Sequence, residues 1–247
     1  MCYKKKSLLN RITDEHKTRL DKYKIKAPCN CCPACRKQRQ NDWLVRSYFE
    51  FLGNHRNAFF VSLDFDDKHL PKYQGIACFD TEKMKQFFKA LRNRIGSFRY
   101  LYATDFGGLL RRPHYHLIVL PEAHLAKSKF LDAVRMSWHN GHYFDVDVIE
   151  SVNNNRLKAI QYVVSYTTKD ITFSLDEELK HQKEVDSLPM RYRPRVQASK
   201  GFGLRALEES IITPDTLRNN AKISIPIGKN GKLVSFAVPR YYEEYQE

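Results

Sequence analysis

Residues 111–120 constrain the fold most, because they place two histidines at the entrance of a short apolar strand. Side chains along a strand alternate between its two faces, so His114 and His116 share one face while Tyr115 points to the other. Pro113 suits the start of a strand because it cannot donate a hydrogen bond to the ladder. Two imidazoles side by side on a rigid strand are half of a metal site.

The segment before the histidines predicts a β-hairpin. Residues 98–105 have the composition of a strand, and Gly107 and Gly108 supply a turn into the histidine strand. In such a hairpin Asp105 comes close to the histidines and would be a third, oxygen ligand of the metal. The alternative is that Asp105 is an ordinary turn residue.

Residues 156–169 are predicted to form a helix, because apolar side chains recur on one side of it at about 100° per residue. Tyr162, Tyr166 and Lys169 are related as i, i+4 and i+7, and they share the opposite side. Tyrosines at this spacing commonly serve only in packing. Their position away from the apolar stripe instead favours a chemical role.

Taken together, these residues resemble the rolling-circle replication initiators that carry a His-hydrophobic-His motif and paired tyrosines. The resemblance is greatest to the initiators of gokushovirus-like microviruses. Those initiators usually carry Glu where this chain has Asp105. The matching segments follow the expected order through most of the chain: Cys29 to Cys35, Trp43, residues 59–64, Asp105, His114-Tyr115-His116, residues 162–169 and residues 239–242.

The resemblance implies an endonuclease that nicks single-stranded DNA at an origin and later rejoins the strand. Tyr162 or Tyr166 would attack the phosphodiester, giving a 5′-phosphotyrosine link and a free 3′-hydroxyl. Mg²⁺ or Mn²⁺ on the two histidines and Asp105 would neutralise charge on the phosphate. Lys169 would stabilise the phosphate or the phenolate. A host DNA polymerase and helicase are the implied partners, and the cytoplasm of a bacterial host is the implied location.

The charge of the chain favours an anionic partner. The 42 Lys and Arg residues exceed the 28 Asp and Glu residues, which gives a formal net charge of +14. A basic balance of this size is typical of proteins that bind nucleic acid, although a ribosomal or membrane-surface protein would share it. The sequence has no apolar run long enough for a membrane span and no apolar segment after its Lys-rich start. We therefore expect neither a membrane span nor a secretion signal.

Four of the six cysteines fall within seven residues, too close together to staple distant parts of a fold. Without an export signal, metal binding is favoured over disulfides. The Cys-x-x-Cys-x-x-Cys spacing of Cys29, Cys32 and Cys35 predicts a structural zinc knuckle, and Cys2 would supply the fourth ligand. Cys31 or His16 could replace Cys2, and a loop of reduced thiols is the alternative to zinc.

The order of predicted elements gives the fold class. Helices are expected at 36–52, 81–95 and 124–139, alternating with strands that include 59–65 and 141–149. This order predicts an α+β fold with a mostly antiparallel central sheet flanked by helices, as in the His-hydrophobic-His endonucleases. The expected domains are a Cys-rich arm at 1–40, an endonuclease core at 41–175 and an extension at 176–247.

The extension begins with a polar segment, residues 175–200, which we expect to be an exposed basic connector. Its arginines alternate with Tyr192, a pattern that suits contacts to phosphates and bases. A helix after Gly203 and a hairpin around Asn230-Gly231 are expected to complete the extension. The candidate DNA contacts are Arg111, Arg112, Arg191, Arg193 and Arg195.

Three alternatives remain open from the sequence. Gly108, followed after five intervening residues by His114 and His116, matches the opening motif of the all-β cupins, but Glu122 comes late and helices crowd the chain. In a non-enzymatic zinc-knuckle nucleic-acid binder, the histidines would be core residues. A transposase or plasmid relaxase would share the nicking chemistry.

Overall fold

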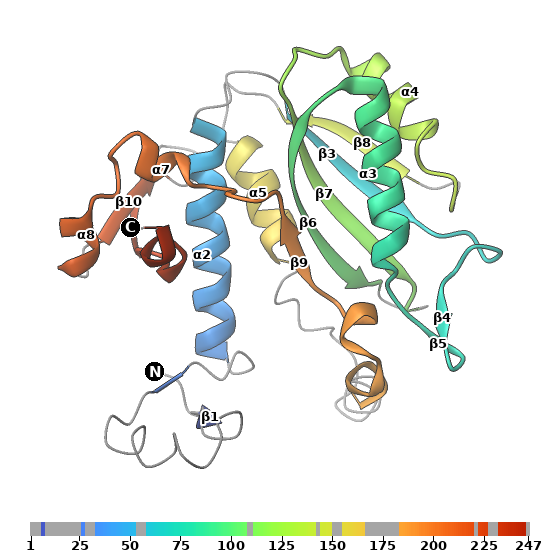
Figure 1. The fold of residues 1–247 in the computed structure, drawn as a ribbon, viewed down its shortest axis with the longest axis horizontal. Coiled ribbons are helices and arrows are strands. Elements are labelled where there is room, and N and C mark those ends of the chain that lie inside the picture. Colours follow the sequence, from blue (N-terminus) through green and yellow to red (C-terminus); the bar gives the residue numbers. More distant parts are fainter. Residues whose placement is uncertain are drawn as a thin grey trace.

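The computed structural model describes residues 6–7, 26–27, 33–52, 58–107, 111–141, 144–149, 155–165, 183–219, 222–226 and 232–245. Its centre is a five-stranded sheet in the order β8-β3-β7-β6-β9, and every pairing in that sheet is antiparallel (Figure 1). The strands are β3 (Ala58–Asp64), β6 (Phe98–Phe106), β7 (Pro113–Pro121), β8 (Phe144–Ile149) and β9 (Val196–Ala198). The predicted α+β class with an antiparallel sheet is confirmed, and the all-β cupin alternative is wrong.

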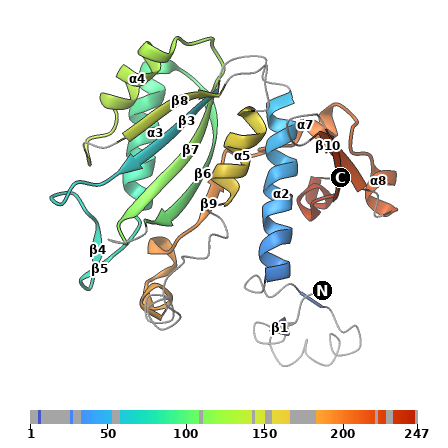
Figure 2. The ribbon, with the colours of Figure 1, turned by 180° about the vertical axis from the view of Figure 1, so that it is seen from behind.

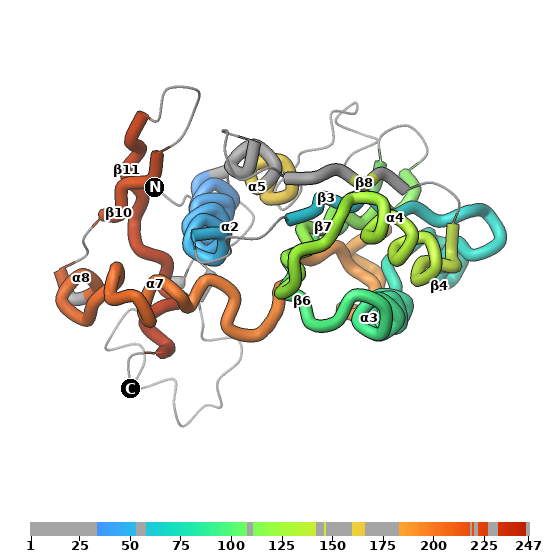
Figure 3. Tube along the Cα trace, turned by 90° about the horizontal axis from the view of Figure 1, so that it is seen from above, coloured from blue at the N-terminus to red at the C-terminus, as the bar shows by residue number. Residues whose placement is uncertain are grey.

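Helices cover both faces of this sheet. They are α2 (Pro33–Leu52), α3 (Thr81–Ile95), α4 (Lys127–Arg135) and α5 (Asn155–Ser165). One buried cluster joins the sheet to α3 and α4, and a second joins the other face to α5, α2 and the C-terminal segments. Seen from above, α3 and α5 lie on opposite sides of the strands (Figure 3).

Helix α3 has the predicted bounds, and local chemistry explains both ends. The Asp80 carboxylate accepts hydrogen bonds from the backbone N–H groups of Glu82 and Lys83, which satisfies donors that the first turn leaves unpaired. Gly96 ends the helix with a φ of 77°. The predicted stripe of Met84, Phe87, Phe88 and Leu91 is buried on the sheet.

The predicted helix at 124–139 is shorter than expected, since α4 ends at Arg135. The chain turns after α4 and brings Trp138 back to the sheet. There the Trp138 ring packs on Phe65 and Phe87, and its Nε1–H donates to the carbonyl oxygen of Asp64 at 2.9 Å. Tertiary packing therefore overrides the helical periodicity at this end.

The segment 175–200 also differs from the expected exposed connector. Residues 196–198 form β9, which pairs with β6 at the edge of the sheet. The Thr104 hydroxyl accepts a hydrogen bond from the backbone N–H of Arg195 at 2.7 Å, and the Thr104 N–H donates to the Arg195 carbonyl. These bonds extend the pairing by one residue and tie the connector to the sheet.

The shorter elements complete the chain. The pair β10 and β11 confirms the predicted C-terminal hairpin, and no helix in the described ranges has the length and apolar character to cross a bilayer. The proposed boundaries at 40/41 and 175/176 stay predictions. The remaining bounds are β1 (Lys6–Ser7), β2 (Lys26–Ala27), β4 (Lys72–Tyr73), β5 (Ile76–Ala77), η2 (Met190–Tyr192), α7 (Arg205–Glu208), α8 (Pro214–Arg218), β10 (Lys222–Pro226), β11 (Leu233–Ala237) and η3 (Arg240–Tyr245).

The C-terminal extension docks on α2, on the side away from the sheet (Figure 2). The Arg46 guanidinium of α2 lies 4.1 Å from the Trp43 ring centroid and 3.5 Å from that of Tyr241. Arg46 also donates to the carbonyl oxygen of Phe202. Gly203 comes so close that a Cβ there would lie 2.8 Å from the Arg46 carbonyl oxygen.

This contact makes the stability of the docked extension testable. Gly203→Ala should lower the free energy of unfolding by about 3 kcal/mol, because the added Cβ meets backbone and the residue has a φ of 88°. Urea denaturation measures this loss. Gly75→Ala is the matched control, since Gly75 has a φ of 81° with nothing within 4 Å of its Cβ position. It should lose only about 1 kcal/mol, and equal losses for the two variants would contradict the close contact.

Candidate functional site

Polar side chains gather where three central strands meet at one end of the sheet. In the strand register, Asp64 of β3 and Asp105 of β6 both lie opposite His114 of β7. Ser62 lies opposite His116 in the same way. Directly opposed residues of antiparallel strands project to the same face. The structure thus brings Asp105 and both histidines onto one face and adds two residues of β3 to them.

The β3 side chains hold the two imidazoles. Nδ1 of His114 forms a close hydrogen-bonded pair with the Asp64 carboxylate. Nδ1 of His116 lies 3.4 Å from Oγ of Ser62, with the donor set by the tautomer. Sequence analysis missed both partners. The signal was present, because Phe60, Ser62 and Asp64 alternate on one face and become polar towards the end of the strand.

Burial divides the site into an inner and an outer part. Asp105 and His116 are each only 7% exposed, whereas the side chains of His114 and Asp64 are 25% and 31% exposed. The two imidazole centroids lie 6.4 Å apart. In the ranges described above, no three His, Cys, Asp or Glu side chains are spaced as a ready metal site. A metal would therefore require these side chains to turn towards one another.

Gly107 makes room for His114. A Cβ at Gly107 would lie 2.1 Å from Nε2 of His114, so any larger residue would displace the imidazole. The Gly107 N–H also donates to the Arg112 carbonyl at 2.8 Å, which extends the pairing of β6 with β7. Sequence analysis assigned this glycine only to the turn, and the structure adds close packing against a site histidine.

Tyr162 of α5 lies against His116. The ring centroids are 5.8 Å apart with an interplanar angle of 78°, and the Tyr162 ring meets Phe60 in a similar way at 5.4 Å. Tyr162 is 47% exposed, whereas Val163 and Val164 beside it are buried. The tyrosine side of α5 thus points away from the apolar stripe and reaches the histidine face. Tyr166 and Lys169, the other two residues of the predicted tyrosine face, lie outside the described residues.

The predicted zinc ligands are described only in part. Cys35 is buried in the first turn of α2, while Cys2, Cys29 and Cys32 lie outside the described residues, as do Cys31 and His16. The zinc knuckle stays a prediction. Cys78 is buried in the core, where desolvation and the nearby Asp80 carboxylate raise the pKa of its thiol to about 11.

Two of the candidate DNA-binding arginines lie directly before β7. Arg111 has a φ of 46°, an uncommon value outside glycine. Arg112 forms an ion pair with the Asp67 carboxylate and donates to the Phe65 carbonyl. Arg112 therefore ties the loop after β3 to the start of β7.

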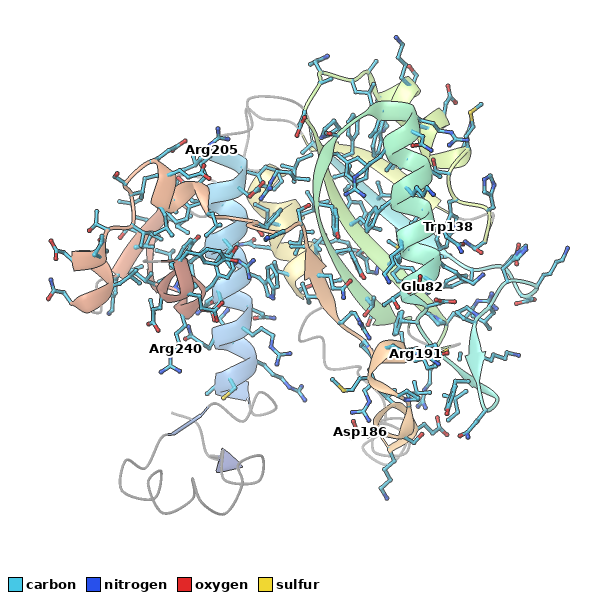
Figure 4. All side chains as sticks on the ribbon, viewed as in Figure 1. Glu82, Trp138, Asp186, Arg191, Arg205 and Arg240 are labelled. Carbon is cyan, nitrogen blue, oxygen red and sulfur yellow. The ribbon has the colours of Figure 1, made fainter. Side chains whose placement is uncertain are left out.

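The other three arginines lie on the segment that projects beyond the sheet, where Arg191 and Asp186 are labelled in Figure 4. Arg191 is exposed and stacks over the Tyr192 ring at 4.7 Å. The Arg193 guanidinium donates to the carbonyls of Leu188 and Asp186, and Arg195 donates to that of Met190. Arg193 and Arg195 thus stabilise the bend of this segment, and their contact with DNA stays a prediction.

Comparison with known proteins gives two sequence matches to viral proteins. Residues 58–171 match the family of replication-associated proteins of the ORF2 type. The chain is 26% identical over 234 residues to the replication-associated protein ORF2 of Spiroplasma virus 4, covering 89% of this chain and 67% of that protein. The family match includes the strands and the helix that carry the candidate site.

A solved structure also resembles part of the chain. The crystal structure of the hypothetical protein ORF119 from Sulfolobus islandicus rod-shaped virus 1 aligns with a TM-score of 0.33 and 18% identity. The alignment covers 52% of this chain and 96% of that one. The two sequence matches indicate that the chain is a replication-associated protein of viral origin, similar to the ORF2 family.

Proposed function

We propose that this protein initiates rolling-circle replication by nicking single-stranded DNA with a tyrosine nucleophile. The observation that carries the proposal is the contact between the exposed Tyr162 ring and His116, on the face that also holds His114 and Asp105. A nucleophile and candidate metal ligands then meet the same phosphate. The net charge of +14 supports binding to a polyanion, and the matches to replication-associated proteins support the origin as substrate.

The reaction needs an accessible phenol. The Tyr162 oxygen would attack phosphorus, the bond to the 3′-oxygen would break, and the phenolic proton would pass to that oxygen. Reversal of these steps rejoins the strand. Other tyrosines near the histidines suit this role poorly, because burial raises the pKa of Tyr115 and of Tyr102 well above that of an ordinary phenol. Both rings lie in the core, whereas Tyr162 is half exposed.

The donor set fits a hard or borderline divalent cation. Nε2 of His114, Nε2 of His116 and a carboxylate oxygen of Asp105 would hold Mg²⁺ or Mn²⁺. When bound, the cation would offset charge on a non-bridging phosphate oxygen. Asp64 and Ser62 engage Nδ1 of the two imidazoles, which makes Nε2 the ligating nitrogen and fixes each ring. Metal-binding histidines commonly have such carboxylate or hydroxyl partners.

Tyr166 and Lys169 complete the proposed site by their positions on the predicted helix. A second tyrosine would let one molecule cut a new origin while the first still holds the old strand end. Lys169 would stabilise charge on the phosphate or on the phenolate. The free 3′-hydroxyl would serve a host polymerase working with a helicase.

The nucleophile is tested by mapping the protein–DNA adduct. Each of Tyr162→Phe and Tyr166→Phe should retain part of the adduct formed with origin DNA, whereas the double variant should form none, because only the nucleophilic oxygens are removed. Denaturing gels and peptide mapping give the result. Tyr245→Phe, another exposed tyrosine, should behave as wild type. Undiminished adduct from the double variant would favour the non-enzymatic binder.

Metal dependence gives a second test. EDTA should abolish adduct formation and Mn²⁺ or Mg²⁺ should restore it. His114→Ala/His116→Ala should keep its circular dichroism spectrum yet cut about 100-fold more slowly, since a bound cation contributes several kcal/mol to such reactions. Equal cleavage with and without EDTA would rule out the metal role.

Gly107→Ala tests the placement of His114 without removing any proposed ligand. The new Cβ would push Nε2 aside, and we expect nicking to slow by about 10- to 100-fold, because small misplacements of reacting groups are costly. The free energy of unfolding should change little, since a side chain can yield more easily than backbone. A variant that nicks at the wild-type rate would show that the position of the His114 imidazole is not critical.

A further inference from the structure

An open pocket of about 630 Å³ lies beside the candidate site. One wall is the loop that follows β3, and the other is the segment that follows α4, where Trp138 is labelled in Figure 4. Neither wall includes a proposed nucleophile or metal ligand. The lining residues are Asp66, Lys68, His69, Arg135, Trp138, His139 and Gly141.

The two walls are fixed to each other. The Asp66 N–H donates to the Asn140 carbonyl at 3.1 Å, and the Trp138 indole N–H donates to the Asp64 carbonyl at 2.9 Å. Gly141 lies so close that a Cβ there would be 2.2 Å from the same Asp64 oxygen. The pocket is therefore preformed, and it shares Asp64 with the site, since the Asp64 carboxylate pairs with His114.

The charge of the lining favours an anion. Lys68 and Arg135 are exposed permanent cations, and His69 and His139 add two imidazoles. The carboxylate in the lining, Asp66, accepts from the His69 N–H at 2.8 Å and lies 2.7 Å from Nδ1 of His69. These bonds hold the loop in shape and direct the carboxylate towards the loop itself.

We propose that this pocket binds backbone phosphates of the single DNA strand next to the nicked bond. The pocket is wide enough for a nucleotide-sized segment, and lysine and arginine neutralise phosphates without reading the bases. The pocket thus positions the strand so that one phosphodiester reaches the candidate site, and it is independent of sequence. This inference rests on the proposed function for the identity of the strand.

The salt dependence of DNA binding tests the pocket directly. We compare Lys68→Gln/Arg135→Gln with Lys89→Gln/Lys129→Gln, which removes the same charge from exposed positions on α3 and α4 outside the pocket lining. Fluorescence anisotropy of a labelled single-stranded oligonucleotide, in EDTA to prevent cleavage, gives the affinity across a range of salt. The pocket variant should bind about tenfold more weakly at about 0.15 M salt, and its log–log salt slope should be shallower by about 1.4.

The control pair should keep the wild-type slope, and the loss in the pocket variant should be the same for oligonucleotides of different sequence. Equal slopes for the two variants, or no binding by the wild type, would overturn the proposal. Failure of the proposed function has another signature, in which the wild type forms no adduct with metal present. That result combined with a shallower slope for the pocket variant would leave the pocket assigned and the nicking chemistry rejected.

Discussion

The register of β6 against β7 is the constraint on which the rest of the site depends. It places Asp105 opposite His114, and the hydrogen bond from Gly107 to Arg112 extends it into the turn. A slip of one residue would turn every side chain of one strand to the other face. The apolar residues of both strands prevent such a slip, because burial on two faces leaves only one register without polar groups in the core. Packing of the core therefore fixes the relative positions of the site residues.

The two faces of the sheet serve different purposes. Towards α3 and α4 the strands bury aromatic side chains such as Tyr115 and Phe59 in a continuous core. Towards α5 the same strands are apolar at one end and polar at the other, and the second core includes α2 and the C-terminal segments. Helix α5 meets this face near the change from apolar to polar. Its buried valines hold it there while Tyr162 lies at the polar edge.

The junction between the sheet and the C-terminal extension is held by buried charge. Glu50 of α2 forms an ion pair with Arg99 of β6 and accepts from the Gly203 N–H at 2.6 Å. Arg46, one helical turn earlier, stacks on Tyr241 and donates to the Phe202 carbonyl. A buried carboxylate is costly unless it is paired, and here Glu50 has both a cation and an amide donor. Helix α2 thus links the sheet and the extension through two charged residues on successive turns.

The sequence by itself determined those features whose physical cause is local. The 3.6-residue period and the Asp80 cap define α3, the glycine-containing turn defines the β6–β7 hairpin, and the alternation of β7 places both histidines on one face. The side of α5 that carries Tyr162 follows from periodicity in the same way. Asp105 came next to the histidines because the hairpin joins strands that are close in sequence.

Only the tertiary structure decided which distant segments meet these elements. Asp64 is 50 residues from His114, and its pairing follows from the order of strands in the sheet, which no local pattern encodes. Trp138 left its predicted helix because its indole found the Asp64 carbonyl and an aromatic core. Residues 196–198 joined the sheet because the edge of β6 offered unpaired backbone groups. Each outcome reflects competition between local preference and long-range contacts, and the long-range contacts exist only once the whole core has packed.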